Sequence, residues 1–409
     1  MNGLPVGMFG RKGHLASQHR APNHLCYVEM GAADFDIAIV GGGPAGATCL
    51  LALAGSGLRV LVVEKAVFPR PKACGDAVPG LALRVWEGLA PGLPARLAQL
   101  PSARSLADGY VCGPFGGRCR VQFVHPGLVV RRAELDAALL AYAQAQTPCT
   151  LATAALKSLE PLPDGFALHL ADGRSFTTRR LAAADGATGP CRKLLTGLAW
   201  QAAEVSLAVR TYLPAGAGGA GADALALWFD KALLPGYLWA FPLADGTQNV
   251  GAGVLRLRPG QNLKQALAQW TARPADDERP QAEPDASAWL GQKLPLGLAG
   301  RSISGPGYCL LGDAGGLVAP ATGDGIGQAA LSGQLAAQAL VASLRQRGLA
   351  ETPQGLAQAY DAPLYRRLGP SFTAQRRMVA LGRHAPWLLE GIIRLASRSE
   401  ALRQRLASL

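Results

Sequence analysis

The sequence predicts an α/β fold with two lobes and a helical C-terminal region. Three observations predict it: a strand–turn–helix–strand pattern over residues 36–64, a strand-rich stretch over 205–255, and helical periodicity from about residue 355 onward. Of the 409 residues, 49% are hydrophobic and 17% are charged. This composition excludes a disordered protein, and the length allows a large buried core.

The first element is a βαβ unit. Residues 36–40 and 59–64 are short apolar runs rich in Ile and Val, and residues 47–54 between them are predicted to be helical. The stretch 37–58 carries no charge, but its six glycines and Pro44 argue against a membrane-spanning helix.

The turn of this unit has the pattern G-x-G-x-x-G and predicts a Rossmann-type dinucleotide site. Gly41 allows the tight turn, Gly43 lets the backbone approach a pyrophosphate, and Gly46 lets helix and strand pack closely. Ala45 lies at the helix N-terminus, whose free N–H groups attract phosphates. Glu64, followed by Lys65, ends the second strand where an acid accepts hydrogen bonds from a ribose. The same pattern at Gly216–Gly221 has no helix behind it and is interpreted as a loop.

The following elements favour FAD over NAD. A helix is predicted over 131–145, a hairpin over 166–176, and a short apolar run over 181–184. A strand over 308–311 and a helix over 325–344 come later. Apart from the hairpin, each precedes or contains a residue suited to a cofactor contact, and the order of these residues along the chain predicts FAD. These residues are Arg132, Asp185, Gly186, Gly312, Asp313, Gly323, Gly325 and Ile326.

The strand-rich stretch carries an aromatic pattern. Tyr237, Trp239 and Phe241 alternate, so on a strand they share one face and form an aromatic wall. Gly251 and Gly253 follow on the next strand-like segment. Such a wall suits a long apolar ligand beside the flavin, although a half-buried strand gives the same pattern. Residues 272–288, rich in Pro, Asp and Glu, are predicted to be an exposed linker.

These motifs together resemble the geranylgeranyl reductase family, within the flavoproteins that share the p-hydroxybenzoate-hydroxylase-like fold. The resemblance covers about residues 34–400. Besides the βαβ unit, it rests on Pro69–Asp76, which contains Lys72, Cys74 and Gly75, and on Tyr-x-Trp-x-Phe-Pro at 237–242 with Gly-x-Gly eight residues later. It implies a flexible N-terminal tail (1–33), a discontinuous FAD-binding domain (34–105, 125–200 and 300–350), a β-sheet substrate-binding domain (106–124 and 201–299) and a helical C-terminal region (351–409).

The resemblance also implies a reaction: reduced FAD donates hydride to an isoprenoid double bond. Cys74 is then expected near the flavin, as a proton donor or as a thiolate, with Tyr237 and Trp239 beside it and Gly251 and Gly253 among the substrate-binding residues. Lys72 and Arg70 are candidates for holding a diphosphate headgroup, unless Arg70 is simply solvated. The electron donor is NADPH or a ferredoxin acting as redox partner.

Two other classes remain as alternatives. A flavin-dependent monooxygenase or halogenase, acting on an aromatic small molecule or on a peptide or protein side chain, shares this fold and a similar aromatic motif. An electron carrier to quinone is disfavoured, because such proteins carry a cysteine-ligated cluster near the C-terminus and no cysteine follows Cys309.

Charge and cysteine content indicate partners and compartment. The net charge is +12, and residues 363–409 contain nine arginines against Glu390 and Glu400. The segment 385–396 is amphipathic, so it either contacts anionic membrane peripherally or packs as an ordinary helix. Aromatic interleaving is absent, so nucleic acid is not expected. The eight cysteines lack CxxC spacing and the N-terminus lacks a signal peptide, which predicts a cytoplasmic protein. His14, His19, His24 and Cys26 are assigned to the tail, and no metal site is expected.

Overall fold

A computed structural model describes residues 33–215, 224–254, 262–272, 289–346 and 353–407. Several sequence predictions lie outside the described residues. They are the N-terminal tail up to residue 32 with its three histidines, the second glycine motif at 216–221, and residues 273–288 of the predicted linker.

The first sheet is built around β1, which pairs in parallel with β2 on one side and β9 on the other. Strand β16 extends the parallel set beyond β9, and β6 extends it beyond β2. The carboxyl ends of these strands therefore meet at one edge, where open α/β sheets bind ligands. The strands of this sheet are β1 (Phe35–Val40), β2 (Val60–Glu64), β6 (Thr150–Thr153), β7 (Leu156–Leu162), β8 (Gly165–Leu170), β9 (Ser175–Ala183), β15 (Ser304–Gly305) and β16 (Tyr308–Leu310).

Local structure follows the sequence expectations with two differences. Helix α1 begins at Pro44 rather than at residue 47, because proline is well suited to the first turn of a helix, where no N–H partner is needed. The predicted hairpin forms between β8 and β9, but the segments at 174–176 and 181–184 belong to one continuous strand. That strand pairs with β8 along its first half and with β1 along most of its length.

The second sheet has the order β14-β10-β13-β12-β11-β4-β5-β3. Three stretches assigned from the sequence to the nucleotide-binding segments belong here instead: Ala77–Val78, the start of β4, and the end of β5. The end of β5 lies between the other two stretches: Leu128 and Val129 pair with β3 on one side and with the start of β4 on the other. The strands are β3 (Ala77–Val78), β4 (Arg104–Cys112), β5 (Arg118–Val129), β10 (Val205–Pro214), β11 (Leu225–Trp228), β12 (Tyr237–Pro242), β13 (Thr247–Val254) and β14 (Leu290–Pro295).

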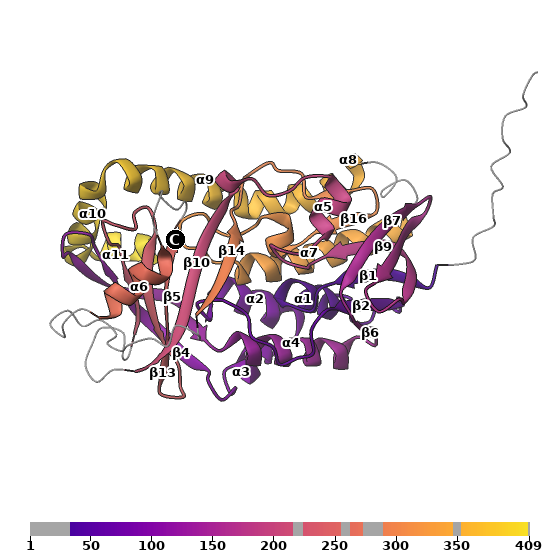
Figure 1. Ribbon diagram of the computed structural model, residues 1–409, viewed down its shortest axis with the longest axis horizontal. Helices are drawn as coiled ribbons and strands as arrows, with labels where there is room; N and C mark the ends of the chain where they lie inside the picture. Colours follow the sequence, from indigo (N-terminus) through magenta and orange to yellow (C-terminus); the bar gives the residue numbers. More distant parts are fainter. Residues whose placement is uncertain (1–32, 216–223, 255–261, 273–288, 347–352, 408–409) are drawn as a thin grey trace, which may run out of the picture. The chain divides into compact units, whose positions relative to one another are not determined.

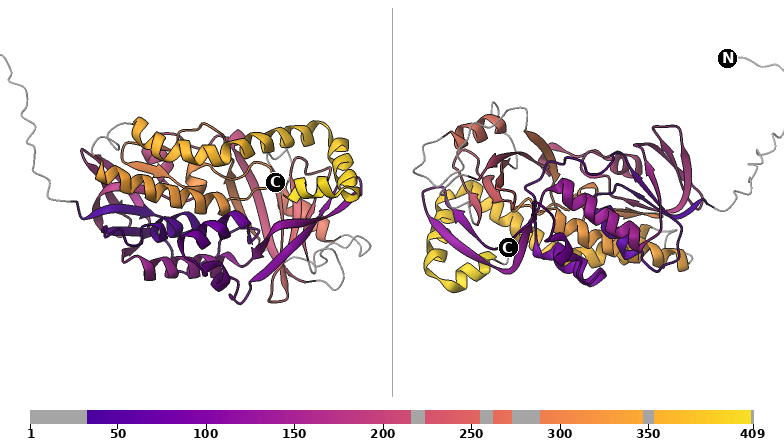
Figure 2. Two further views of the ribbon diagram at one scale, coloured as in Figure 1. Left: turned by 180° about the vertical axis from the view of Figure 1, so that it is seen from behind. Right: turned by 90° about the horizontal axis from the view of Figure 1, so that it is seen from below.

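Helices cover the first sheet and continue past the second. Helix α1 lies between α4 and α7, and α9 crosses α7 to reach α10 and α11, which pack on β5 (Figures 1 and 2). None of the helices in the described part of the chain is both long and apolar enough to cross a membrane. The α-helices are α1 (Pro44–Ala52), α2 (Gly80–Leu89), α3 (Leu93–Leu97), α4 (Arg132–Gln146), α5 (Cys191–Thr196), α6 (Leu263–Thr271), α7 (Ile326–Arg345), α8 (Pro353–Leu356), α9 (Ala362–His384), α10 (Pro386–Arg398) and α11 (Glu400–Ala407); shorter helical turns are η1 (Ala202–Glu204), η4 (Gly312–Gly315) and η5 (Ala357–Asp361).

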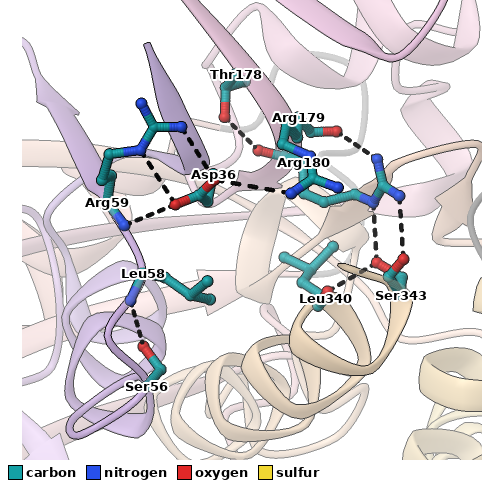
Figure 3. Close-up of polar contacts among 9 residues, drawn as sticks. All are labelled: Asp36, Ser56, Leu58, Arg59, Thr178, Arg179, Arg180, Leu340 and Ser343. Carbon is teal, nitrogen blue, oxygen red and sulfur yellow. Dashed lines mark hydrogen bonds and ion pairs between the residues drawn. The ribbon is translucent and has the colours of Figure 1, made fainter. Parts of the chain in front are cut away.

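At the edge of the first sheet opposite to the ligand edge, charged side chains connect neighbouring strands and helix α7 (Figure 3). Asp36 at the start of β1 accepts hydrogen bonds from Arg59 at 2.9–3.3 Å and lies 3.8 Å from the Arg179 guanidinium. Arg180 donates to the Oγ and carbonyl oxygen of Ser343 in the last turn of α7. A guanidinium there satisfies helix carbonyls that lack partners. These contacts fix β1, β9 and α7 together, so the opposite edge presents its loops from a rigid base.

Candidate active site

One cavity of about 1440 Å³ extends from the ligand edge of the first sheet across the face of the second sheet. Most pockets for a single small molecule measure about 300–1,000 Å³, so this volume leaves room for a dinucleotide and a second ligand. Every site residue predicted from the sequence lines the cavity except Gly46 and Gly251. Residues from segments more than 200 positions apart thus meet in one place.

The nucleotide end of the cavity is formed by the glycine turn. Gly41 has φ +106°, and a Cβ there would collide with the carbonyl group of Ala184. A Cβ on Gly46 would collide with the carbonyl of Gly41, so this residue permits close packing rather than lining the cavity. Helix α1 has no side-chain cap at Gly43 and no acid in its first turn. Its N–H groups are therefore available to a phosphate.

Glu64 lies at the end of β2 beside this turn and is almost fully buried. Its Oε2 accepts a hydrogen bond from the Gly42 N–H at 2.7 Å, and its Oε1 accepts one from the Ala66 N–H at 3.0 Å. A carboxylate offers about four acceptor positions, so two remain for a ribose diol. The backbone contacts orient the carboxylate before any ligand arrives.

The other parallel strands end in two further acids. Asp185 follows β9, and its Oδ2 accepts a hydrogen bond from the Cys191 N–H at 2.8 Å. Its Oδ1 is buried without a partner in the described residues, and burial raises the pKa of this carboxyl despite the Cys191 contact. Asp313 follows β16 and lies on η4 directly after Gly312, whose φ is +52°. Both acids line the cavity, and their carboxylates can accept hydrogen bonds from hydroxyl groups.

The start of α7 closes the middle of the cavity. Gly323, Gly325 and Ile326 line it as predicted, and so does Asp324, which sequence reasoning missed. Asp324 accepts a hydrogen bond from the Ile326 N–H at 3.0 Å, yet burial raises its pKa to about 6. This carboxyl therefore holds a proton at a higher pH than an ordinary aspartate does. Asp324 lies between two glycines directly before a helix, and this pattern could have indicated a site residue from the sequence.

Cys74 lies beside a buried ion pair. Arg132 donates to both carboxylate oxygens of Asp136 at 2.8 Å, and Arg70 lies 3.3 Å from the same carboxylate. Burial raises the pKa of the Cys74 thiol, although the Arg132 charge opposes this shift. The raised pKa favours the thiol form of Cys74 over the thiolate. Burial also disfavours the charged form of Lys72, so it lowers the pKa of that ammonium group.

The aromatic wall forms on β12. The Tyr237 and Trp239 ring centres are 6.0 Å apart, and those of Trp239 and Phe241 are 6.2 Å apart, with all three rings on the cavity. The Tyr237 hydroxyl donates to the carbonyl of Thr322 in the loop before α7. Gly251 lies opposite Trp239 on β13, and a Cβ there would enter the indole ring. Its place among the substrate-binding residues is thus corrected: it makes room for Trp239 and does not line the cavity.

A buried polar network behind the wall was not predicted. Asp76 is fully buried at φ +66° and accepts hydrogen bonds from the Tyr212 hydroxyl at 2.6 Å and from the Asn249 amide at 2.7 Å. The same amide donates to the carbonyl of Cys74, and its oxygen accepts from the Trp239 indole N–H at 2.9 Å. The network therefore links the cysteine loop to the aromatic wall.

The arrangement fits a flavin dinucleotide. The glycine cradle, the oriented Glu64 and the unpartnered Asp185 oxygen lie along one edge, and the N-terminus of α7 follows them. Helix N-termini stabilise the negative charge that a reduced flavin carries. No group of three or more metal-ligating side chains comes together within the described ranges. A flavin supplies hydride chemistry, and the aromatic wall lines the same cavity as the glycine turn.

Comparison with known proteins agrees with this geometry. No family model matches the chain. The menaquinone reductase of Mycobacterium tuberculosis is 32% identical over 373 residues, covering 85% of this chain and 83% of that protein. Digeranylgeranylglycerophospholipid reductase 1 of Methanopyrus kandleri is 27% identical over 333 residues, covering 76% of this chain and 82% of that protein.

Solved structures show the same fold. A geranylgeranyl bacteriochlorophyll reductase-like protein from Thermoplasma acidophilum superposes with a TM-score of 0.76 at 20% identity, over 91% of this chain and 95% of that one. The halogenase PltM superposes with a TM-score of 0.70 at 15% identity, over 91% and 83% of the two chains. At such identities the likeness concerns the fold alone. The level of identity to the curated reductases carries the assignment: the chain belongs to the geranylgeranyl reductase family of FAD-dependent oxidoreductases.

Proposed function

We propose that this enzyme uses FAD to reduce carbon–carbon double bonds in an isoprenoid chain. The observation that carries the proposal is the single cavity, because the nucleotide cradle and the aromatic wall line it together. The names of the relatives agree with it, since one reduces a digeranylgeranylglycerophospholipid and another, from Oryza sativa, reduces geranylgeranyl diphosphate. A prenyl chain is long, apolar and uncharged, which matches the apolar lining of the second sheet.

When bound, reduced FAD supplies the hydride. The chain's own residues then hold the substrate: Tyr237, Trp239 and Phe241 offer a continuous apolar surface on which a prenyl segment can lie flat. An unactivated alkene reacts slowly, so alignment of the double bond must lower much of the barrier. The network behind Trp239 fixes the indole in place and thereby contributes to that alignment.

We assign the proton to the thiol of Cys74. The raised pKa of this thiol keeps the proton on sulfur at neutral pH, which suits a donor and disfavours the thiolate alternative. The proton passes to the alkene carbon that does not receive hydride, so the double bond gains two hydrogens. Arg132 stabilises the thiolate that remains until solvent restores its proton.

The electron donor is NADPH, bound transiently, or a ferredoxin that acts as redox partner. Each donor gives its own signature: NADPH reduces the flavin of the isolated protein directly, whereas a ferredoxin must be added in its reduced form. Both can be compared in one anaerobic absorbance experiment.

We propose that α10 rests on an anionic membrane surface. Trp387 and Leu395 on this helix are 65% and 60% exposed, and Arg394 and Arg398 lie beside them. Apolar side chains flanked by arginines are typical of helices that lie in the headgroup region. Leu389 and Ile392 of the same helix line the far end of the cavity, so a lipid chain could enter there. Flotation with vesicles of anionic lipid tests this, with Trp387→Ser and uncharged vesicles as controls.

Product analysis tests the reductase proposal. The purified protein is reduced with dithionite without oxygen and incubated with geranylgeranyl diphosphate in deuterated water. The expected product gains two hydrogens per reduced bond, and both are deuterium, because the transferable hydrogen of dithionite-reduced flavin comes from the solvent, as does the proton of the Cys74 thiol. The halogenase-like fold makes oxygenation or halogenation the competing outcome. A hydroxylated or halogenated product, formed only with oxygen present, would overturn the proposal.

A further inference from the structure

The turn before α7 extends from the nucleotide end of the cavity to the aromatic wall. A methyl group added to Gly325 would lie 3.3 Å from the Asp313 carboxylate, and one added to Gly323 would lie 3.3 Å from the Tyr237 hydroxyl. Asp324 lies between these two glycines and lines the same cavity. In the proposed function, hydride passes from the cofactor to a substrate on the wall, so the flavin ring is expected in the interval that this turn spans.

The Asp324 carboxylate occupies the N-terminus of α7. Its Oδ1 accepts a hydrogen bond from the Ile326 N–H at 3.0 Å. Its Oδ2 lies 2.9 Å from the side-chain nitrogen of Gln328, in the amide orientation that satisfies both residues. A negative charge at this position offsets the partial positive charge of the helix end. The protein itself therefore weakens the field that would stabilise an anionic reduced flavin.

Asp324 is faced by groups from several other elements. Burial raises the pKa of its carboxyl to about 6, and the charge of Asp313 on η4 adds to this rise. Burial also raises the pKa of Tyr237 on β12, and the Asp324 charge contributes, so this phenol stays neutral. Pro79 and Leu81 at the start of α2 are apolar and pack against the first turn of α7. The Asp324 carboxyl is therefore ionised at neutral pH and loses its charge in mild acid.

We infer that Asp324 lowers the reduction potential of the bound flavin, because its negative charge offsets the positive end of α7. A lower potential makes the reduced flavin a stronger hydride donor, and protein charges near the ring are a general means of adjusting it. This role of Asp324 rests on the proposed function, since reduction of an unactivated alkene is what requires a strong donor.

The reduction potential of the FAD-loaded protein tests this role without substrate or turnover. It is measured by anaerobic titration against a dye of known potential, at pH 5 and at pH 8. The variants are Asp324→Asn, whose amide oxygen can still accept the Ile326 N–H, and Asp324→Glu, which keeps the charge. Asp361→Asn is the matched control. Burial also raises the pKa of Asp361, and its carboxylate accepts the Ile303 N–H at 3.2 Å, but it does not line the cavity.

The expected result is a higher potential in Asp324→Asn at pH 8. This variant should favour reduced over oxidised flavin by about tenfold or more, which corresponds to a rise of about 30 mV or more for a two-electron couple. Asp324→Glu and Asp361→Asn should keep the wild-type potential. At pH 5 the wild-type carboxyl is itself mostly protonated, so the difference between the wild type and Asp324→Asn should nearly vanish. A purely structural effect of the substitution would persist at both pH values.

Three results would overturn this role of Asp324: a potential in Asp324→Asn that is unchanged or lower at pH 8, a shift that is equally large at pH 5, or an equal shift in Asp361→Asn. The proposed function fails separately. If the potentials differ as expected but the reduced wild type never reduces the prenyl chain, the role of Asp324 stands and the reductase activity does not.

Discussion

At the scale of single residues, the position of Trp239 depends on the glycine opposite it. A methyl group on Gly251 would enter the indole ring, whereas the nearest atom to a methyl group on Gly253 is 3.7 Å away. Gly251→Ala should therefore lower the free energy of unfolding by about 1–3 kcal/mol through overpacking. Urea unfolding of the FAD-loaded protein measures this.

Gly253→Ala is the matched control, because it adds the same methyl group two residues along the same strand where there is room for it. It should change the stability by less than about 1 kcal/mol. Equal losses in the two variants would show that the indole does not rest on β13 as described.

Asp76 is the residue on which the network behind the wall depends. Asp76→Ala leaves the buried donors of Tyr212 and Asn249 without an acceptor and places alanine at φ +66°. A loss of about 2–4 kcal/mol is expected from the two effects together. Thermal unfolding measures the loss, and alkylation of Cys74, followed by mass spectrometry, should become faster. Asp76→Asn, which tolerates positive φ and keeps an acceptor, should retain most of the stability; if it falls as far as the alanine variant, the account of the network is wrong.

Asp324 predicts a pH dependence of stability. Its pKa is raised to about 6 in the folded protein from an ordinary 3.8, so the folded chain binds this proton more tightly than the unfolded chain does. The resulting stability is fully present below about pH 4 and is lost as the pH rises through about 6. The melting temperature of Asp324→Asn should therefore rise relative to the wild type between about pH 4 and pH 7.

Asp245 provides a control with the opposite sign. Although burial alone would raise its pKa, hydrogen bonds from Thr247 and Arg131 hold it below the ordinary value. Its contribution to stability is lost as the pH falls, so Asp245→Asn should lose stability relative to the wild type at neutral pH and not in acid. If the melting temperatures of the wild type and Asp324→Asn instead change by the same amount between about pH 4 and pH 7, Asp324 is not buried as described.

Which residues could be predicted from the sequence depends on how local their signal is. Gly41, Gly43 and Glu64 belong to one motif of about thirty residues, so the glycine spacing and the strand–helix–strand pattern around it predicted them together. Asp76 and Asn249 are 173 positions apart and meet only through the pairing of the second sheet. Contacts of this kind are decided by tertiary packing, and a single sequence does not reveal them.

At the scale of elements, Glu390 fastens α10 to the turn between β4 and β5. Its carboxylate accepts hydrogen bonds from the N–H groups of Phe115 at 3.0 Å and Gly117 at 2.7 Å, and Arg394 donates to it as well. Glu390→Ala should free this turn and the end of the cavity that α10 covers. Hydrogen–deuterium exchange should rise by about tenfold or more at residues 113–117 and along α10.

Glu400→Ala is the comparison, because Glu400 forms an ion pair with Arg403 at the exposed surface of α11. It should leave exchange at residues 113–117 unchanged, since exposed pairs contribute little. If residues 113–117 exchange at the same rate in Glu390→Ala and Glu400→Ala, then Glu390 does not hold α10 in place.

The elements themselves were more predictable than their boundaries. The βαβ unit, the hairpin of β8 and β9, and α7 follow from periodicity and turn residues, which act over short distances. The start of α1 and the continuity of β9 were missed because Pro44 and the polar residues after Phe176 look like interruptions in the sequence. In the structure, proline fits the first helical turn, and the pairing of β9 with β8 and β1 sustains the strand.

At the scale of the whole molecule, two sheets share one cavity, and each contributes what the other lacks. In the function that we propose, the glycine turn of the first sheet holds the cofactor, and the aromatic wall of the second sheet holds the substrate. The halogenase-like fold has the same plan, so the fold alone does not decide between reduction and oxygenation. Reduction and oxygenation differ in whether the reduced flavin reacts with the substrate or with oxygen.

Anaerobic stopped-flow spectroscopy tests that point most directly. Protein reduced with dithionite is mixed in separate runs with geranylgeranyl diphosphate and with oxygen, and flavin absorbance is followed. We expect the prenyl compound to oxidise the flavin, and oxygen to oxidise it slowly without a C4a-hydroperoxide. A long-lived C4a-hydroperoxide together with no response to the prenyl compound would contradict the proposed reductase activity.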